Sequence, residues 1–354
     1  MRAFQDLLGI QKPIVQAPMA GVQGSALAIA VSNAGGLGSL PCAMLSLPDM
    51  HSELSMIRAN TDRPFNVNFF CHTQPEPDAE REATWRATLS PYCKEYGIIA
   101  SNPNPGGPGR TPFNEKTADL LEQFKPAVVS FHFGLPSASL MAQVKAMGST
   151  ILASATTVEE ACWLEEHGVD AIIAQGLEAG GHRGMFLSED LTTQVGTFAL
   201  LPQIVKRVKL PVIAAGGIAD AAGVGAAMAL GAVAVQIGTA YLLCPEVTTT
   251  PIHRAALKSA AARHTAVTNL FSGRPARGIV NRIVAELGPI NKNVPAFPLA
   301  APMLTSLRAK AESLGDNGFS PLWCGQNADG CLELPAGEVT RMLAARAETV
   351  SSSS

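Results

Sequence analysis

The sequence predicts an α/β protein, a (β/α)8 TIM barrel with a smaller, mostly helical C-terminal cap domain. Three observations support this prediction. Eight short apolar runs recur between residues 13 and 242, helix-like stretches separate most of them, and polar or glycine residues gather where the runs end. A doubly wound open sheet is the alternative, since it is built from the same kind of units.

The apolar runs are rich in Val, Ile, Leu and Phe, which is typical of strands that are buried on both faces. They cover residues 13–19, 37–42, 65–70, 127–134, 150–156, 171–176, 211–217 and 232–242. Between them, Thr157 and Glu160 have the spacing of a capping box, ahead of a helix that Gly168 would end. Asp220 is a candidate N-cap for a second helix, which would end at Gly231.

Two segments are longer than a plain barrel requires. Residues 71–125 contain the Pro- and Gly-rich stretch SNPNPGGPGRTPFN, so we expect an inserted loop there. The sequence leaves open whether its part at 100–114 covers the barrel. Residues 246–354 contain helical stretches at 252–268, 301–315 and 337–350. We therefore expect a barrel domain at 1–245 and a cap domain at 246–354, whose last helix could return to the barrel.

Composition excludes several classes of function. The net charge is −3 and no basic block occurs, so nucleic acid and anionic membranes are poor partners. The seven cysteines are scattered without a CxxC pair, which argues against a disulfide framework or a zinc site and fits reduced thiols in the cytoplasm. The apolar run 224–244 is interrupted by Gly231, Gln236 and Gly238, so we interpret it as a helix end and a strand. Residues 1–21 lack the pattern of a signal peptide.

The carboxyl ends of the strands are where barrels of this class place their active site. There the sequence has Ala17-Pro18-Met19, Asn68, His132, Gln175-Gly176, Gly216-Gly217 and the segment from Gln236 to Thr239. The glycine turns after the last two strands favour a phosphate site, because glycine lets backbone N–H groups approach the phosphate oxygens. Turns without a ligand are the alternative, and both sugar phosphates and flavin mononucleotide would suit the site.

His182 follows Gly180-Gly181 and precedes Gly184. A glycine-rich loop can lie close to a flat ligand, and a histidine there can accept a proton near neutral pH. A solvated loop histidine is the alternative. Glu178 and His182 are too few ligands for a metal, so no metal is expected. A nucleophile elbow, G-x-S-x-G, is absent from the sequence.

Other charged and polar residues are less clearly placed. His132 stands between Phe131 and Phe133, so it either lines the pocket or packs against a helix. We expect Lys12 and Arg183 to be solvated charges.

Several segments together resemble the nitronate monooxygenases, once called 2-nitropropane dioxygenases. They are PIVQAPMAGV, SNAGGLGSL, FNVNFF, AQGLEAGGHRG and PVIAAGGIADAAGVGAAMALGAVAVQIGTAYLLCPE, and the likeness runs from residue 10 to residue 330. The long insertion, FHFG and PLWCGQ resemble the bacterial class I members. The resemblance implies a (β/α)8 barrel that holds FMN noncovalently beneath a smaller helical domain.

The resemblance also implies roles for single residues. His182 would be the active-site histidine and His132 a second pocket histidine that contacts substrate. The expected cofactor-binding residues are Ala17, Pro18, Met19, Asn68, Gln175, Gly180, Gly216, Gly217, Gln236, Gly238 and Thr239. Where class I enzymes carry tyrosines and a lysine, this chain has Phe297 and Arg308 and no tyrosine. That departure leaves the contacts of the substrate anion undefined.

The activity that the resemblance implies is oxidation of alkyl nitronates, notably propionate 3-nitronate, by molecular oxygen. One-electron transfer through FMN would give a carbonyl or semialdehyde and nitrogen oxyanions. We expect small-molecule partners and a monomer or homodimer. Three alternatives remain: an NAD(P)H-dependent flavin reductase of the enoyl-acyl-carrier-protein or quinone type, a flavin-free lyase or isomerase, and a flavin-binding protein without catalysis.

Overall fold

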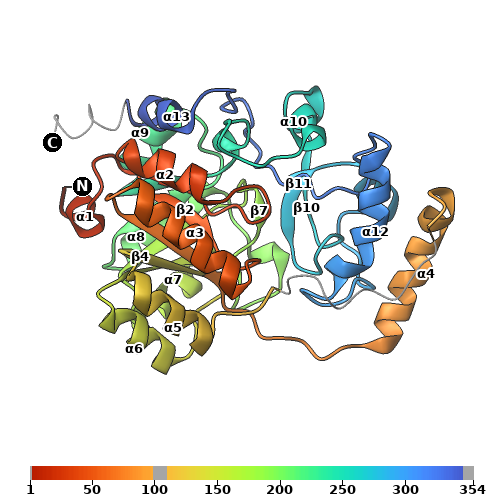
Figure 1. Ribbon diagram of the computed structural model, residues 1–354, viewed down its shortest axis with the longest axis horizontal. Coiled ribbons are helices and arrows are strands. Elements are labelled where there is room, and N and C mark those ends of the chain that lie inside the picture. The colour runs from red at the N-terminus through yellow and green to blue at the C-terminus, as the bar shows by residue number, and fades with distance from the viewer. Residues whose placement is uncertain (1, 99–109, 346–354) are drawn as a thin grey trace.

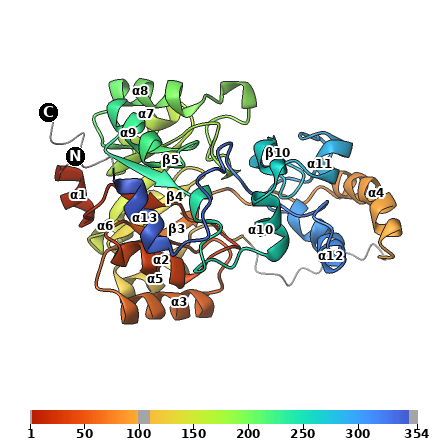
Figure 2. The ribbon, with the colours of Figure 1, turned by 90° about the horizontal axis from the view of Figure 1, so that it is seen from above.

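Eight parallel strands form a barrel, and helices surround it, in the computed structural model of residues 2–98 and 110–345 (Figure 1). The predicted fold is therefore confirmed. A second, smaller lobe lies beside the barrel in both views (Figures 1 and 2). Residues 99–109 of the expected inserted loop lie outside the described residues.

The barrel strands all fall within the predicted apolar runs. They are β1 (Ile14–Gln16), β2 (Gly38–Pro41), β3 (Phe65–Phe70), β4 (Val128–His132), β5 (Thr150–Ala155), β6 (Ala171–Gln175), β8 (Val212–Ala215) and β9 (Ala234–Ile237). Their order is β1-β9-β8-β6-β5-β4-β3-β2. A parallel bridge between Val15 and Leu37 closes the barrel between β1 and β2.

Two of the helices around the barrel begin at the N-cap residue that the sequence predicted. The helices around the barrel are α1 (Arg2–Leu8), α2 (Ser25–Asn33), α3 (Leu47–Asn60), α5 (Glu115–Phe124), α6 (Ala138–Ala146), α7 (Val158–Glu166), α8 (Thr197–Arg207), α9 (Ala221–Ala229) and α13 (Ala336–Ala344). Asp220 caps α9 by accepting from the Gly223 N–H at 2.7 Å. Thr157 caps α7 by accepting from the Glu160 N–H at 3.2 Å. The expected capping box is only half formed, because the Glu160 carboxylate accepts from the N–H and hydroxyl of Thr156, both at 2.7 Å, and not from the Thr157 N–H. Run 224–244 forms the end of α9 and then β9, and no helix among the described residues could cross a membrane.

Side chains alternate between the inside and the outside of the barrel. Ile172 and Ala174 of β6 pack outward against the helices, whereas Ala171 and Ile173 belong to the cluster inside the barrel. Leu8, just at the end of α1, joins this inner cluster. The lower part of the barrel is therefore a packed core, in which each buried aliphatic side chain contributes about 1.5–3 kcal/mol. Only the carboxyl ends of the strands remain available for a ligand.

The second lobe contains a three-stranded antiparallel sheet that the sequence did not predict. Its strands are β7 (Gly181–His182), β10 (Thr265–Thr268) and β11 (Ala276–Ile279), with β11 in the middle. The helical stretch expected at 252–268 is shorter, because Thr265 to Thr268 form β10. This segment is rich in β-branched residues, which favour strands.

The remaining helices show that segments from both ends of the chain cross between the lobes. Those of the second lobe are α4 (Ala79–Glu95), α10 (Pro251–Leu257), α11 (Arg282–Leu287) and α12 (Ala300–Ser313), and short 3₁₀ helices are η1 (Leu191–Thr193), η2 (Thr239–Tyr241) and η3 (Ala260–Arg263). α4 lies within the expected inserted loop, beside α12 (Figure 2). Trp85 of α4 shares a core with Phe319. α13 contacts α2 and α9 of the barrel, and its Thr340 hydroxyl lies 2.9 Å from the Tyr241 hydroxyl.

Candidate active site

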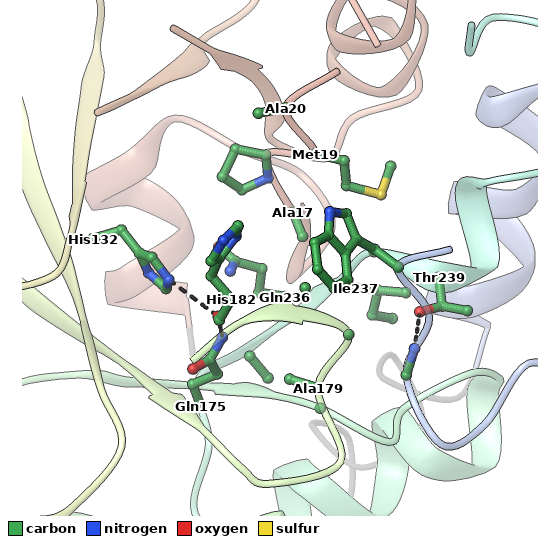
Figure 3. A pocket seen from close by; sticks show the side chains of 18 of the residues that line it. Ala17, Met19, Ala20, His132, Gln175, Ala179, His182, Gln236, Ile237 and Thr239 are labelled. Atoms are coloured by element: carbon green, nitrogen blue, oxygen red, sulfur yellow. Dashed lines mark hydrogen bonds between the residues drawn. The ribbon is translucent and has the colours of Figure 1, made fainter. Parts of the chain in front are cut away.

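A cavity lies at the carboxyl ends of the barrel strands, between the barrel and residues of the second lobe (Figure 3). The structure brings every predicted site residue to its wall. These residues are Ala17, Pro18, Met19, Asn68, His132, Gln175, Gly180, His182, Gly216, Gly217, Gln236, Gly238 and Thr239. In Figure 3, His132 and Thr239 lie on opposite sides of the view, with His182 between them.

The alternation of side chains along the strands explains why polar groups face this cavity. Val128 belongs to the inner cluster, so His132, four residues further along β4, also points inward. Ile173 and Gln175 have the same relationship on β6. His132 therefore lines the pocket, whereas the alternative position against a helix is taken by Phe131, which packs in the outer core.

The three glycines around His182 are required for two different reasons. A Cβ on Gly180 would lie 2.6 Å from the backbone nitrogen of Gly325, and one on Gly184 would lie 2.9 Å from the His132 ring. Gly181 has free space around it, but its φ of +71° strongly favours glycine. Protein atoms occupy the position that a Cβ would take on Gly180 and on Gly184, and the expected contact of this loop with a flat ligand stays a prediction.

The loop that carries His182 is fixed to the second lobe. Gly181 and His182 form β7, which pairs antiparallel with β11, so that His182 lies opposite Ala276. The guanidinium of Arg277 on β11 also donates to the Leu177 carbonyl at 2.9 Å. The histidine therefore belongs to an edge strand whose position is set by the lobe above the barrel.

Two barrel residues hold the backbone of His182 from the other side. Its carbonyl accepts from Gln175 Nε2 at 3.0 Å and from His132 Nε2 at 3.2 Å. The other atom of the Gln175 amide, Oε1, accepts from the Gly184 N–H at 2.7 Å. Gln175 thus holds the loop at two points, which leaves one N–H bond and one lone pair of its amide for a ligand.

The contacts of His132 define its protonation. A carbonyl oxygen can only accept, so Nε2 carries the ring proton and Nδ1 accepts from the Ser154 hydroxyl at 3.0 Å. Burial lowers the pKa of His132 to about 3, and the charge of Arg274 adds to this effect. His132 is therefore neutral at physiological pH, and both of its ring nitrogens are bound to the protein.

The imidazole of His182 lies among aromatic rings. Its ring centre is 5.4 Å from that of Trp323, 5.5 Å from that of Phe297 and 6.0 Å from that of Phe133. Burial holds the pKa of His182 well below its usual range, and the positive charge of Arg110 lowers it further. A neutral imidazole in a partly apolar cavity can accept a proton or donate one hydrogen bond.

The glycine turns after β8 and β9 form the far end of the cavity. Gly216 and Gly217 have φ values of +112° and +74°, so the turn after β8 depends on glycine at both positions. Asn327 Nδ2 donates to the Gly217 carbonyl at 3.3 Å. The Gly325 N–H donates to the Thr239 hydroxyl at 3.0 Å, so the hydroxyl proton of Thr239 is still available to a ligand. The WCGQ segment thus closes this end of the cavity.

One wall is the segment from Ala17 to Met19. Gln23 fixes it, because its Oε1 accepts from the Met19 N–H at 3.0 Å and from Gln16 Nε2 at 2.7 Å. A Cβ on Gly238 would touch Ala17 at 3.3 Å, so the wall and the β9 turn are in direct contact.

Arg183 was expected to be a solvated charge, and this prediction is wrong. The side chain is fully buried and donates to Gln175 O at 2.8 Å, Gly176 O at 2.6 Å and Gln194 Oε1 at 3.0 Å. These acceptors compensate for the loss of water. Lys12, expected to be solvated as well, is half-buried.

Phe297 and Arg308 occupy the region where the class I enzymes carry tyrosines and a lysine, but the two side chains lie in different places. Phe297 is buried in the aromatic group around His182. Arg308 donates to the Glu312 carboxylate at 2.7 Å on the same face of α12 and does not line the cavity.

Sequence reasoning missed several residues of the cavity. Ser154 follows the same inward alternation as Leu152 on β5 and could have been found by it. Arg110 lies at the end of a Pro- and Gly-rich stretch, which offered no periodicity. Trp323 and Asn327 come from a segment far along the chain, and only tertiary packing brings them to the cavity.

The fold and the site define a (β/α)8-barrel enzyme whose cavity combines glycine turns at two strand ends with a buried neutral histidine. The family model described as nitronate monooxygenase matches residues 2–344, so the chain belongs to that family. Membership makes the protein an oxidoreductase and implies dependence on a flavin.

Individual relatives agree with this assignment. The chain is 46% identical over 347 residues to a nitronate monooxygenase of Paraburkholderia phytofirmans, covering 97% of this chain and 94% of that one. It is 43% identical over 343 residues to a nitronate monooxygenase of Pseudomonas aeruginosa, with 96% and 97% covered. The solved structure of nitroalkane oxidase from Streptomyces ansochromogenes superposes with a TM-score of 0.89 at 39% identity, covering 99% of this chain and 100% of that one.

Proposed function

We propose that this protein oxidises alkyl nitronates with molecular oxygen, using FMN bound in the cavity. The products are a carbonyl compound and nitrogen oxyanions, nitrite or nitrate. The observation that carries the proposal is the neutral imidazole of His182, which is held over the cavity between the barrel and the second lobe. Family membership supports the reaction class.

The cavity has unfilled polar capacity that fits a flavin. The Oε1 atom of Gln236 is buried and has no hydrogen-bond partner among the described residues, so a ligand that donates there would relieve a desolvation cost. Gly217, Gly238 and the Thr239 hydroxyl offer a site for a phosphate. Thr239 lies on the side of the cavity opposite His132 in Figure 3. Because Gly325 and Asn327 close that end, a mononucleotide suits the cavity better than a dinucleotide.

The chemistry that FMN supplies when bound is one-electron transfer from the nitronate to oxygen. The protein supplies position and charge. Pro18 and Met19 form the wall for a flat ring, with Asn68 and the free N–H of Gln175 as hydrogen-bonding groups. Phe133, Phe297 and Trp323 exclude water around His182, which strengthens every polar contact there.

His182 has a different task with each form of the substrate. A nitronate has already lost its α-proton, so a neutral imidazole needs only to hold the negatively charged nitro oxygens. A neutral nitroalkane must first lose that proton, and the lowered pKa keeps His182 in the form that can accept it. His132 keeps the His182 backbone in place, and contact between His132 and the substrate remains a prediction.

Oxygen consumption tests the proposal directly. Purified protein is mixed with propionate 3-nitronate, without NADH or NADPH, and oxygen uptake is recorded. We expect rapid uptake and formation of nitrite or nitrate together with the semialdehyde. A yellow protein that takes up no oxygen, and whose flavin is bleached by NADH or NADPH under anaerobic conditions, would instead be a reductase of the same barrel type.

A further inference from the structure

Two arginine side chains lie against the aromatic rings that surround His182. The guanidinium carbon of Arg110 is 5.4 Å from the centre of the Phe297 ring, and that of Arg274 is 4.0 Å from the centre of the Phe133 ring. Both charges act on His182, since both lower its pKa. The cavity therefore has a positively charged side next to the histidine.

The two arginines differ in how they are held. Arg274 donates to the Met185 carbonyl and stacks on Phe133, so its position is fixed by the protein. Arg110 lines the cavity, and its guanidinium forms no hydrogen bond or ion pair with another residue in the ranges 2–98 and 110–345. A largely buried guanidinium without a partner is costly, and an anionic ligand would compensate for it.

His72 provides a second unpartnered group at the same place. Its side chain is 5% exposed, and neither ring nitrogen has a hydrogen-bond partner among the described residues. The ring centre is 4.7 Å from that of Phe297, the ring that also faces Arg110 and His182. Phe297 therefore lies beside a guanidinium and an imidazole whose side chains have no hydrogen-bond or ion-pair partner in the part of the chain that the structure describes.

We propose that Arg110, supported by His72 and Arg274, binds a carboxylate that the substrate carries apart from its nitronate group. The inference rests on the proposed function and names the residue that holds the second negative charge of a substrate such as propionate 3-nitronate. A guanidinium matches a carboxylate in shape and charge and binds it with paired hydrogen bonds. His182 then holds the nitronate end of the same molecule, while Phe297 packs between the two groups.

Arg308 lies in the region where the class I enzymes carry a lysine near the substrate. Because its side chain does not line the cavity, Arg308 is excluded as the residue that binds the substrate anion. Its guanidinium is paired with Glu312, whose carboxylate also accepts from the Ser320 hydroxyl at 2.6 Å. Arg110 and Arg308 are thus a matched pair for an experiment, since each loses the same charge on substitution but only Arg110 lines the cavity.

The test compares two nitronates of the same chain length in the flavin-loaded enzyme. Propionate 3-nitronate carries the carboxylate, and propyl 1-nitronate has a methyl group in its place. In Arg110→Gln, we expect the ratio of kcat/KM between the two to fall by about tenfold to hundredfold, mainly through KM. In Arg308→Gln the ratio stays at the wild-type value. An unchanged ratio in Arg110→Gln, or an equal fall in both variants, overturns the proposal.

Calorimetric titration with succinate, an unreactive dicarboxylate, gives a readout that does not depend on turnover. We expect binding to the wild-type protein to weaken at least about tenfold in Arg110→Gln, as loss of a charged hydrogen bond implies. Succinate binding that depends on Arg110 in a protein that oxidises neither nitronate would support the carboxylate site and contradict the proposed function. Oxidation of both nitronates without any dependence on Arg110 would support the proposed function and contradict the carboxylate site.

Discussion

The hydroxyl oxygen of Ser272 lies 2.8 Å from Nε2 of His182. Ser272 comes from the segment between β10 and β11 of the second lobe, whereas the loop of His182 follows barrel strand β6. The same hydroxyl donates its proton to the Arg274 carbonyl at 3.3 Å. In that arrangement Nε2 of His182 donates to Ser272, and Nδ1 keeps a lone pair that can accept a proton from substrate. When the hydroxyl instead turns to donate to Nε2, Nδ1 carries the ring proton and can donate to the nitro oxygens of a nitronate.

Replacing Ser272 with alanine tests this positioning role. We expect Ser272→Ala to lower kcat/KM for neutral nitroalkanes by about threefold to tenfold, the effect of one lost hydrogen bond. Flavin content should stay the same, because Ser272 does not line the cavity. Ser272→Thr keeps the hydroxyl and should recover most of the rate. A threonine variant as slow as the alanine variant would show that packing, and not the hydrogen bond, is what matters.

Replacing His182 with asparagine separates its two tasks. We expect His182→Asn to slow neutral nitroalkanes by about 10²- to 10⁴-fold, the usual contribution of a general base. Nitronates should slow much less, because the amide still donates a hydrogen bond to the nitro oxygens. Steady-state oxygen uptake with nitroethane and with ethyl nitronate measures both. Equal losses on the two substrates would rule out the base role.

The barrel could be predicted because its strands are buried on both faces, so each one is a continuous apolar run such as AIIAQ. The end of such a run also marks the cavity, since the residue that continues the inner face, Gln175, is polar. The sheet of the second lobe could not be predicted. Its strand β7 has only two residues, one of them glycine, and exists because β11 lies beside it.

The charged residues show the limit of reasoning from sequence. Arg183 and Arg110 look alike in a loop, yet one is satisfied by the carbonyls of Gln175 and Gly176 and the other faces the cavity. No periodicity separates these cases, because the acceptors come from a strand end that folding brings alongside. The role of Gly180 was likewise hidden, since its neighbour Gly325 is far away along the chain.

Because several histidines are buried in their neutral form, we predict that the free energy of unfolding falls in mild acid. Burial lowers the pKa of His72 and His253 to about 4 and that of His132 to about 3. In the unfolded chain these groups titrate near 6.5. Between the two values the unfolded chain binds more protons, so stability falls as the pH drops below 6.5. Each histidine should account for about 2 kcal/mol between pH 7 and pH 5.

Urea unfolding at pH 8, 7, 6 and 5 measures this dependence. We expect the free energy of unfolding to change little between pH 8 and 7 and to fall steeply below 6.5. With its pKa lowered to about 4, His253 stays mostly neutral in the folded state over this pH range, and its Nε2 donates to the Trp323 carbonyl at 3.1 Å. His253→Gln should therefore reduce the loss between pH 7 and 5 by about 2 kcal/mol. If the variant has the same pH dependence as the wild type, the lowered pKa of His253 is not a cause of the loss of stability.

Gly180 packs directly against the backbone of the WCGQ segment, so a methyl group added at this position should push the histidine loop and that segment apart. A Cβ there would lie 2.6 Å from Gly325 N and 2.7 Å from the carbonyl carbon of Cys324, and backbone atoms cannot move aside as a side chain can. We expect Gly180→Ala to cost about 1–3 kcal/mol of stability, as overpacking does. It should also weaken retention of the flavin, because Gly325 is the residue that bonds Thr239 at the phosphate end.

Gly223 provides the matched control, since it lies in α9 with its nearest contact at 3.4 Å and needs no special backbone angle. Gly223→Ala should be neutral or stabilise the protein by about 0.5–1 kcal/mol, because alanine favours a helix. Thermal unfolding and the flavin absorbance after gel filtration compare the two variants. If Gly180→Ala unfolds and retains flavin as Gly223→Ala does, the contact between the histidine loop and the WCGQ segment does not hold the cavity closed.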